Sequence, residues 1–461
     1  MQTSTIKRYV PFIVLGLLCI GGLFTPTLSD FNGAGTYKDA DIAWVLVATA
    51  LVFLMTPGLA FFYGGMVNRR NVLSTMIKSF IATGLVTVIW VVVGYSLAFG
   101  KSMGGFIGNP LSNPFFAGVN SGKPWPGGPT IPLLLFALFQ LKFAIITPAL
   151  VVGAVAERIR FNAYLLFMVL FSLFVYAPIA HWTWHPDGFL GKMGVLDFAG
   201  GTVVHISAGC AALAGALVLK KRHSEATFPA NIPYVTLGTG LLWFGWFGFN
   251  AGSALAANSL AVGAFAATNT AAGSAGMAWV LFDVVRGKKP SVLGFCIGAV
   301  VGLVAITPAA GYVGVPQSLF IGFLAAIVSN VAAHWKSKTG IDDTLDVFPC
   351  HGLGGIVGMI LTGVFASKAI NPAGANGLFY GGLPLFLTQL KGLGIVVGYS
   401  FTMSYLIFRL INVLSPLRVT RQEELVGLDE SQHGEKYVQG TLLVDSSGTG
   451  ELAETRQVEH F

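Results

Sequence analysis

Long apolar stretches recur along the whole chain, and this recurrence constrains the fold more than any other feature of the sequence. A helix must run through about 20 predominantly apolar residues to cross the hydrocarbon core of a membrane. Only 10% of the 461 residues are charged and 54% are hydrophobic, whereas a soluble domain carries about 25% charged residues. We therefore predict an all-α polytopic membrane protein with eleven transmembrane helices. The predicted helices lie near residues 42–67, 76–99, 131–155, 161–182, 196–219, 233–254, 259–285, 291–307, 317–335, 348–366 and 389–414.

The basic residues mark one side of this predicted bundle. Lysine and arginine outnumber aspartate and glutamate by 27 to 20, a net charge of +7 that could suggest a nucleic-acid partner. They fall, however, in short runs after the odd-numbered helices: Arg69/Arg70, Arg158/Arg160, Lys220/Lys221/Arg222, Arg286/Lys288/Lys289 and Lys336/Lys338. By the positive-inside rule these loops are cytoplasmic. We predict a protein of the cell (inner) membrane with no nucleic-acid partner, an external mature N-terminus and a cytoplasmic C-terminal tail, residues 415–461.

The first residues are typical of a secretory signal. Lys7 and Arg8 precede an apolar run from Tyr9 to about Leu23, and the sequence TLS at 27–29 then precedes a polar segment that begins at Asp30. This pattern predicts a cleaved signal peptide over residues 1–29. A short extra spanning helix is the alternative.

An aspartate and a histidine recur at the same spacing in two places. Asp197 and His205 are eight positions apart in the fifth predicted helix, and Asp343 and His351 are eight positions apart at the start of the tenth. Five helices in each half would invert the second repeat relative to the first, so that the two histidines approach each other near the membrane midplane. The expected repeats are 42–219 and 233–366, and 389–414 is an extra helix.

His205 and His351 are functional candidates, because a polar ring inside a membrane costs free energy unless another polar group binds it. Each could instead be a structural histidine bonded to a backbone carbonyl. Two neutral imidazoles in contact can share one proton, since each ring offers a donor and an acceptor. Such a pair would let a neutral polar solute form hydrogen bonds, and it would also be able to relay a proton.

Three segments closely resemble signatures of the ammonium transporter (Amt/MEP/Rh) family. They are DFAGGTVVH at 197–205, WFGFNAGS at 246–253 and DVFPCHG at 346–352. The resemblance extends from about residue 40 to 437 and implies a homotrimer of eleven-helix protomers, each with its own narrow pore. It implies an Amt-type transmembrane domain over residues 30–414. This domain would capture NH4+, deprotonate it and pass NH3, with or without the proton, through a hydrophobic pore lined by the histidine pair.

The resemblance also assigns roles at the outer mouth. Trp184 and Ser253 would recruit ammonium, through the π-face of the indole and through a hydroxyl oxygen. Phe143 and Phe249 match the stacked phenylalanines that close the pore, and Phe143 also borders the recruiting site. On residue type alone, Trp184 would equally be an interfacial tryptophan, and the phenylalanines would be ordinary core or lipid-facing residues.

Asp197 matches an acid that organises the recruiting site. A bare carboxylate there would be costly, so we expect it to accept hydrogen bonds from backbone amides and from hydroxyls such as that of Thr202. The segment between Trp184 and Asp197 is one residue longer than the family pattern. This length leaves Trp182 as an alternative to Trp184.

Lys142 departs from the family pattern. It directly precedes Phe143 in the third predicted helix, where a small or apolar residue is more usual. A cation that faced the pore would repel an incoming cation. We expect instead that its ammonium group points away from the pore, towards another protomer or an acceptor at the interface.

The tail segment GLDESQHGEKY at 427–437 resembles the cytoplasmic C-terminal motif of the family. The resemblance implies docking against the cytoplasmic face, coupling between protomers and, in prokaryotes, a PII-type regulatory protein as partner. A disordered polar tail is the alternative. Residues after 440, rich in Gly, Ser, Thr and Glu, fit that alternative.

Ammonium uptake is the function that these features favour. The alternative is an ammonium sensor that signals through the C-terminal tail, although the recognisable sensor subtype carries an added kinase-like domain. A neutral-gas channel like the Rh branch is disfavoured by the aromatic and hydroxyl recruiting site.

An enzyme that used the two histidines as metal ligands is disfavoured as well. No further carboxylate or thiolate is spaced for a tetrahedral site, and the cysteines stand singly without a CxxC pair. They are Cys19, Cys210, Cys296 and Cys350. We predict no catalytic residue, no metal and no cofactor.

Overall fold

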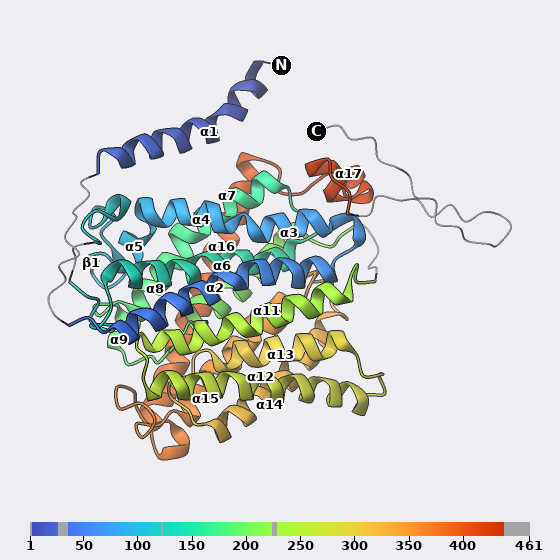
Figure 1. Ribbon diagram of the computed structural model, residues 1–461. Helices are drawn as coiled ribbons and strands as arrows, with labels where there is room; N and C mark the ends of the chain where they lie inside the picture. Colours follow the sequence, from blue (N-terminus) through green and yellow to red (C-terminus); the bar gives the residue numbers. More distant parts are fainter. Residues whose placement is uncertain (1, 26–35, 121–122, 224–227, 438–461) are drawn as a thin grey trace.

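The computed structural model describes residues 2–25, 36–120, 123–223 and 228–437, with side chains described from residue 9 onwards. Helices dominate the arrangement (Figure 1). The α-helices are α1 (Gln2–Leu23), α2 (Asp39–Met66), α3 (Val72–Phe80), α4 (Ala82–Ile89), α5 (Tyr95–Phe99), α6 (Leu133–Val155), α7 (Phe161–Phe171), α8 (Ala177–Trp184), α9 (Phe189–Lys192), α10 (Ser207–Leu219), α11 (Ile232–Ala251), α12 (Ser259–Val285), α13 (Val292–Ile306), α14 (Val315–Lys336), α15 (Gly354–Phe365), α16 (Leu383–Leu414) and α17 (Arg421–Val426). A small antiparallel hairpin joins β1 (Ser102–Met103) to β2 (Ile107–Gly108).

Within the described residues, eight helical stretches are long and apolar enough to cross a membrane. They are Asp39–Met66, Arg69–Phe99, Leu133–Val155, Phe161–Lys192, Gly201–Leu219, Val315–Lys336, Phe348–Phe365 and Leu383–Leu414. Each overlaps a predicted range, and α11, α12 and α13 occupy the other three. The predicted all-α membrane class is therefore confirmed. The last helix begins at Leu383 rather than at 389, because Pro384 fits the first helical turn, where a backbone N–H has no partner inside the helix.

Several of the predicted helices contain π-helical turns, which sequence analysis missed. These turns are η2 (Trp90–Gly94), η4 (Ser172–Tyr176), η5 (Gly201–Ile206) and η7 (Phe348–Leu353). The last two contain His205 and His351. A π turn widens the helix locally and is frequent at functional sites.

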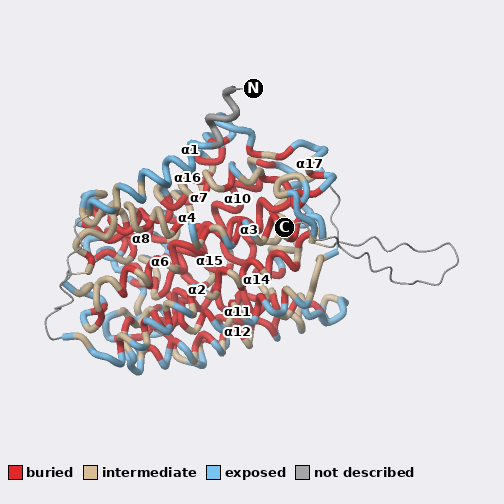
Figure 2. The backbone as a smooth tube through the Cα atoms, turned by 45° about the horizontal axis from the view of Figure 1, so that its top comes forward, coloured by how far each residue is buried: buried red, intermediate tan, exposed pale blue. Residues whose placement is uncertain are grey.

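Small residues let the helices approach one another closely. A Cβ atom on Gly238 of α11 would lie 2.7 Å from the carbonyl oxygen of Gly58 in α2. A Cβ on Gly302 of α13 or on Gly322 of α14 would collide with the carbonyl oxygen of Ala271 in α12. Because lipid provides no hydrophobic driving force between helices, such close contacts are a main source of stability. Figure 2 shows buried residues running through the centre of the bundle.

The helices run roughly parallel, so the bundle has two ends (Figure 1). We name each end after one of its residues, the Ser253 end and the Arg158 end. The Ser253 end holds the start of α2, where the Asp41 carboxylate accepts a hydrogen bond from the Ala257 N–H (2.8 Å). The hairpin and α9 lie at the same end, on the left of Figure 1. The Arg158 end, on the right, holds α17 and the rest of the docked tail.

The first described helix, α1, lies outside this packing. α1 runs apart from the bundle in Figure 1 and exposes apolar side chains such as Phe12, which is 76% exposed. The end of the predicted signal peptide, residues 26–29, lies outside the described residues. So does the part of the tail after Tyr437.

Candidate functional site

The carboxylate of Asp197 organises the turn that leads into α10. Its Oδ1 accepts hydrogen bonds from the N–H groups of Gly200 (2.8 Å) and Gly201 (2.6 Å). Its Oδ2 accepts one from the Thr202 N–H (2.7 Å) and another from the Thr202 hydroxyl. The bonds expected for this acid are therefore present. Asp197 precedes the helix rather than lying within it: the helical segment begins at Gly201, not at 196, because Gly200 has a φ of +113° that suits glycine.

Asp343 plays the same part before η7. Its carboxylate accepts hydrogen bonds from the N–H groups of Val347 (3.0 Å) and Phe348 (2.7 Å). Such bonds satisfy donors that the first helical turn leaves without an internal partner. The repeated Asp and His spacing thus corresponds to a repeated structure, in which a carboxylate caps a π-helical turn that carries a histidine.

The two histidines of these turns contact each other. The Nδ1 atoms of His205 and His351 lie 3.3 Å apart, and the rings are inclined by 24°. One Nδ1 must therefore donate a proton while the other accepts it. The Nε2 of His205 is buried and has no hydrogen-bond partner among the described residues. The pair shares one internal proton and keeps a further polar atom free.

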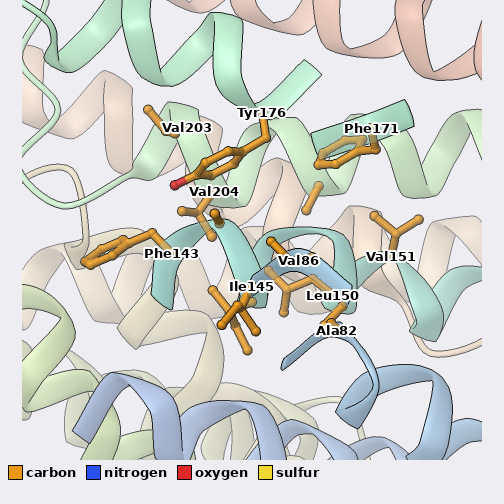
Figure 3. Packing of buried hydrophobic residues seen from close by; sticks show 14 of the residues in the cluster. Ala82, Val86, Phe143, Ile145, Leu150, Val151, Phe171, Tyr176, Val203 and Val204 are labelled. Carbon is orange, nitrogen blue, oxygen red and sulfur yellow. The ribbon is translucent and has the colours of Figure 1, made fainter. Parts of the chain in front are cut away.

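A narrow void lies beside the pair, with about 10 Å³ open to the centre of a water-sized sphere. It is lined by Met55, Leu59, Phe62, Ile146, Leu150, His205, Leu242, Trp246, Phe249, Val300 and His351. Apart from the two histidines, these side chains are apolar or aromatic. Figure 3 shows Phe143, Ile145 and Leu150 of α6 in the packed core, with Val86 of α4 drawn near Leu150. The void therefore suits a small solute that needs few hydrogen bonds.

Two phenylalanine rings, one of which lines this void, pack against each other. The rings of Phe143 and Phe249 lie 4.3 Å apart with an interplanar angle of 37°. Both are buried, and the Phe249 ring also lies 5.9 Å from that of His205. The Trp184 ring lies 5.8 Å from that of Phe143 and meets it edge to face, so Trp184, the phenylalanine pair and His205 form a row of neighbouring rings.

The geometry distinguishes Trp184 from Trp182. Trp182 donates a hydrogen bond from its Nε1 to the carbonyl of Phe106 (2.6 Å) and packs against Phe189, away from Phe143. Trp184 donates from its Nε1 to the carbonyl of Asp197 (3.1 Å), which fixes its ring against Phe143. Trp184 is thus the tryptophan that lies beside the phenylalanine pair.

Ser253 lies on a 3-10 turn, η6 (Gly252–Ala254), that follows α11. Its hydroxyl donates to the Phe249 carbonyl (2.8 Å). The hydroxyl proton is therefore directed back into the helix, and the oxygen lone pairs remain able to accept a hydrogen bond. The carbonyl of Phe249 ties this serine directly to the phenylalanine pair.

Lys142 does not line the void. Its Nζ lies 5.1 Å from the centre of the Phe53 ring on α2, and Phe53 is 40% exposed. The ammonium group is thus directed to the outside of the bundle between α6 and α2, where the aromatic face stabilises it. The side chain thus lies away from the void, and its expected direction towards another protomer or an acceptor at the interface stays a prediction.

The tail packs against the Arg158 end. Arg160 forms an ion pair with Glu423 (3.0 Å). The carboxylate of Asp429 accepts hydrogen bonds from the N–H groups of Leu73 (3.1 Å) and Ser74 (2.7 Å) at the start of α3. A carboxylate at a helix N-terminus is favourable, because it satisfies free N–H groups and meets the positive end of the helix dipole. The described part of the tail is therefore docked through specific contacts.

Sequence reasoning missed the role of Trp246. Its ring lies 5.2 Å from that of His205 at an angle of 15°, and its Nε1 donates to the Thr307 hydroxyl (2.9 Å). Its position in the string at 246–253 was the available signal. Within the described ranges, no group of three or more His, Cys, Asp and Glu side chains is arranged to hold a metal ion.

Comparison with known proteins identifies the family. The Ammonium Transporter Family profile matches residues 43–438. A protein of Methanothermobacter thermautotrophicus named putative ammonium transporter is 47% identical over 401 residues, covering 86% of this chain and 98% of that protein. The crystal structure of Saccharomyces cerevisiae Mep2 matches with a TM-score of 0.79 at 34% identity, covering 85% of this chain and 89% of Mep2. A solved protein named Sensor Amt Protein matches with a TM-score of 0.78 at 30% identity, covering 86% and 98%. The chain belongs to the Ammonium Transporter Family.

Proposed function

We propose that this protein transports ammonium across a membrane, and the observation that carries the proposal is the His205–His351 contact beside an apolar void. A charged ion would lose its hydration there without adequate compensation. Neutral ammonia would not suffer this penalty, and the histidine nitrogens would offer it hydrogen bonds. The solute that passes the void is therefore NH3 in our proposal.

Capture of NH4+ precedes this step. The Trp184 face would attract the cation by about 1–2 kcal/mol, and the Ser253 oxygen would accept one of its hydrogen bonds. Asp197 would act indirectly, since its carboxylate is occupied by the turn that holds Trp184 and the start of α10. NH4+ would then lose its proton, and the phenylalanine pair would admit NH3. The proton would either return to the outer side or follow the NH3 through the histidine pair.

We further propose eleven membrane crossings, with α11, α12 and α13 added to the eight long apolar stretches. The Ser253 end would face outside and the Arg158 end the cytoplasm, in agreement with the basic loops at the latter. The similar turns at Asp197 and Asp343 support inverted repeats. The cleaved signal peptide, the location in the inner membrane, the homotrimer and a PII-type protein at the docked tail belong to the same proposal.

Ammonium sensing is the second candidate function. The match to Sensor Amt Protein and the contacts that dock residues 418–437 favour it. A sensor would bind ammonium at the same site but pass little of it. Flux through purified protein in vesicles separates the two functions.

The test is current after an ammonium jump on protein-containing solid-supported membranes, together with ammonium uptake. We expect His205→Ala and His351→Ala to lower flux about tenfold or more, since a missing hydrogen bond in a dry void is costly, while the protein stays oligomeric. The matched control is His334→Ala, at the end of α14 and away from the void. Unaltered flux in both pore variants would exclude the mechanism, and negligible flux through the wild-type protein would favour the sensor.

A further inference from the structure

The loop between α5 and α6 contains an aromatic anchor that the mechanism above does not use. The Trp125 ring stacks on Phe136 of α6 with 4.8 Å between ring centres and a 9° interplanar angle. It also meets the ring edge of Phe99 (5.3 Å) and that of His185 (5.5 Å). Aromatic contacts of this kind stabilise the packing beyond what burial of area alone contributes. Trp125 is therefore held firmly between α5, α6 and the end of α8.

One of these contacts leads to Trp184. His185 is the next residue after Trp184 and caps the C-terminal end of α8. Its Nδ1 accepts a hydrogen bond from the Asp187 N–H (3.0 Å), and its ring stacks on His181 at 4.3 Å. His185 therefore has a fixed orientation, and contact with Trp125 restrains the backbone that carries Trp184.

The same loop reaches Ser253 from the other side. A turn joins Trp125 to Gly128, whose N–H donates to the Trp125 carbonyl (2.9 Å). A Cβ on Gly128 would lie only 3.1 Å from the Leu255 side chain. Leu255 ends the 3-10 turn of Ser253 with a positive φ of 52°, and its N–H binds the Gly252 carbonyl (2.9 Å). The contact between Gly128 and the Leu255 side chain thus stabilises the strained end of the turn that contains Ser253.

The loop end is itself fixed to the bundle. The Thr130 carbonyl accepts a hydrogen bond from the Lys38 N–H at the start of α2 (3.0 Å). Phe136, beneath Trp125, lies one helical turn before Phe139, and Phe139 in turn packs 5.0 Å from Phe143. The short segment from Trp125 to Thr130 therefore touches the supports of both recruiting residues and of the phenylalanine pair.

We propose that residues 125–130 form a clamp that sets the spacing between Trp184 and Ser253, with Trp125 as its positioning residue. The clamp fixes the width of the cation site and so decides how well NH4+ is captured and distinguished from its larger methylated form. This inference rests on the proposed function. A displacement of about 1 Å at a binding site has large effects, so a loosened clamp would weaken capture while the pore beneath stays intact.

The experiment measures concentration-dependent transport of ammonium and of methylammonium in vesicles. We expect Trp125→Ala to raise the KM for ammonium about fivefold with the maximal rate within about twofold, the pattern of lost binding without loss of the later step. Discrimination against methylammonium should fall in the same variant. Trp125→Phe keeps a stacking ring, so its KM for ammonium and its discrimination against methylammonium should lie close to those of the wild-type protein. The matched control is Leu111→Ala in the same loop, a side chain that is 79% exposed.

His185→Ala and Gly128→Ala test the two arms of the clamp separately and remain informative if Trp125→Ala does not fold. Each should raise the KM less than Trp125→Ala does. An unchanged KM and selectivity in the folded variants, or a lower maximal rate at constant KM, would overturn the clamp. Ser253→Ala measured in parallel separates the two proposals. A raised KM for ammonium in Ser253→Ala with an unchanged KM in Trp125→Ala refutes the clamp alone. An unchanged KM in both variants refutes the recruiting site and, with it, the clamp.

Discussion

The Ser253 end and the Arg158 end of the bundle stabilise their charged groups in different ways. At the Ser253 end, the Asp197 carboxylate is surrounded by backbone N–H groups and one hydroxyl. At the Arg158 end, Asp343 lies near charged side chains, because Lys336 forms an ion pair with Asp346 (2.7 Å). Burial raises the pKa of Asp343 to about 6, although the attraction of Lys336 opposes this change.

The rest of the Arg158 end follows the same pattern. Arg222 binds both Glu157 and Asp342, and Arg418 binds Glu424 (2.7 Å). Ion pairs of this kind are weakened by salt and by loss of one partner. The difference teaches that one sequence pattern can cap two similar turns, while the neighbours decide whether the capping carboxylate lies among backbone N–H groups or among charged side chains.

The largest effect is expected when Asp197, the acid at the Ser253 end, is removed. Asp197→Ala would leave the N–H groups of Gly200, Gly201 and Thr202 without their acceptor, at about 1–3 kcal/mol for each unpaired group. We expect loss of folded oligomer and of uptake, a smaller loss for Asp343→Ala, and a mild loss of uptake alone for Ser253→Ala. Oligomer yield, thermal midpoint and uptake are measured together. Equal and mild effects of the two aspartate changes would remove the distinction between the ends.

An intermediate effect is expected at the tail. Removal of Gly427 to Phe461, or the single change Asp429→Ala, deprives the start of α3 of its acidic cap. We expect transport to fall about fivefold, a typical size for coupling between sites, with an unchanged thermal midpoint of the bundle and loss of binding to a PII-type protein. The control is Glu430→Ala, whose side chain is 52% exposed in a weak pair with Lys436. Full activity in the truncated protein would make the tail a passive extension.

The smallest effect on transport is expected at Lys142, which lies between the ends. If its charge faced the pore, repulsion at 4 Å would amount to about 4 kcal/mol at an effective dielectric constant of 20. Since it lies over Phe53 instead, Lys142→Met should change uptake little and lower the stability of the oligomer in detergent. A large rise in uptake with an unchanged oligomer would place the charge in the pore and favour the sensor.

Much of this arrangement was predictable from residue type and spacing. The apolar stretches predicted the helices because lipid requires them, and the spacing of Asp197 and His205, repeated at Asp343 and His351, predicted the contact between the histidines. The π turns that carry His205 and His351 were not predictable, because they depend on which backbone N–H groups the Asp197 and Asp343 carboxylates bind. Trp125 was missed for a similar reason: its partners at 99, 136 and 185 are distant in sequence and meet only through tertiary packing.

The apolar void has a consequence for ions that compete with ammonium. A potassium ion has a similar size but no proton to release, so it would have to enter the void with its full charge. Proteins that conduct potassium replace its water with rings of carbonyl oxygens, whereas the lining here offers two histidines among hydrocarbon and aromatic side chains. The proposed pore would therefore exclude alkali metal ions because they cannot become neutral, whatever their radius.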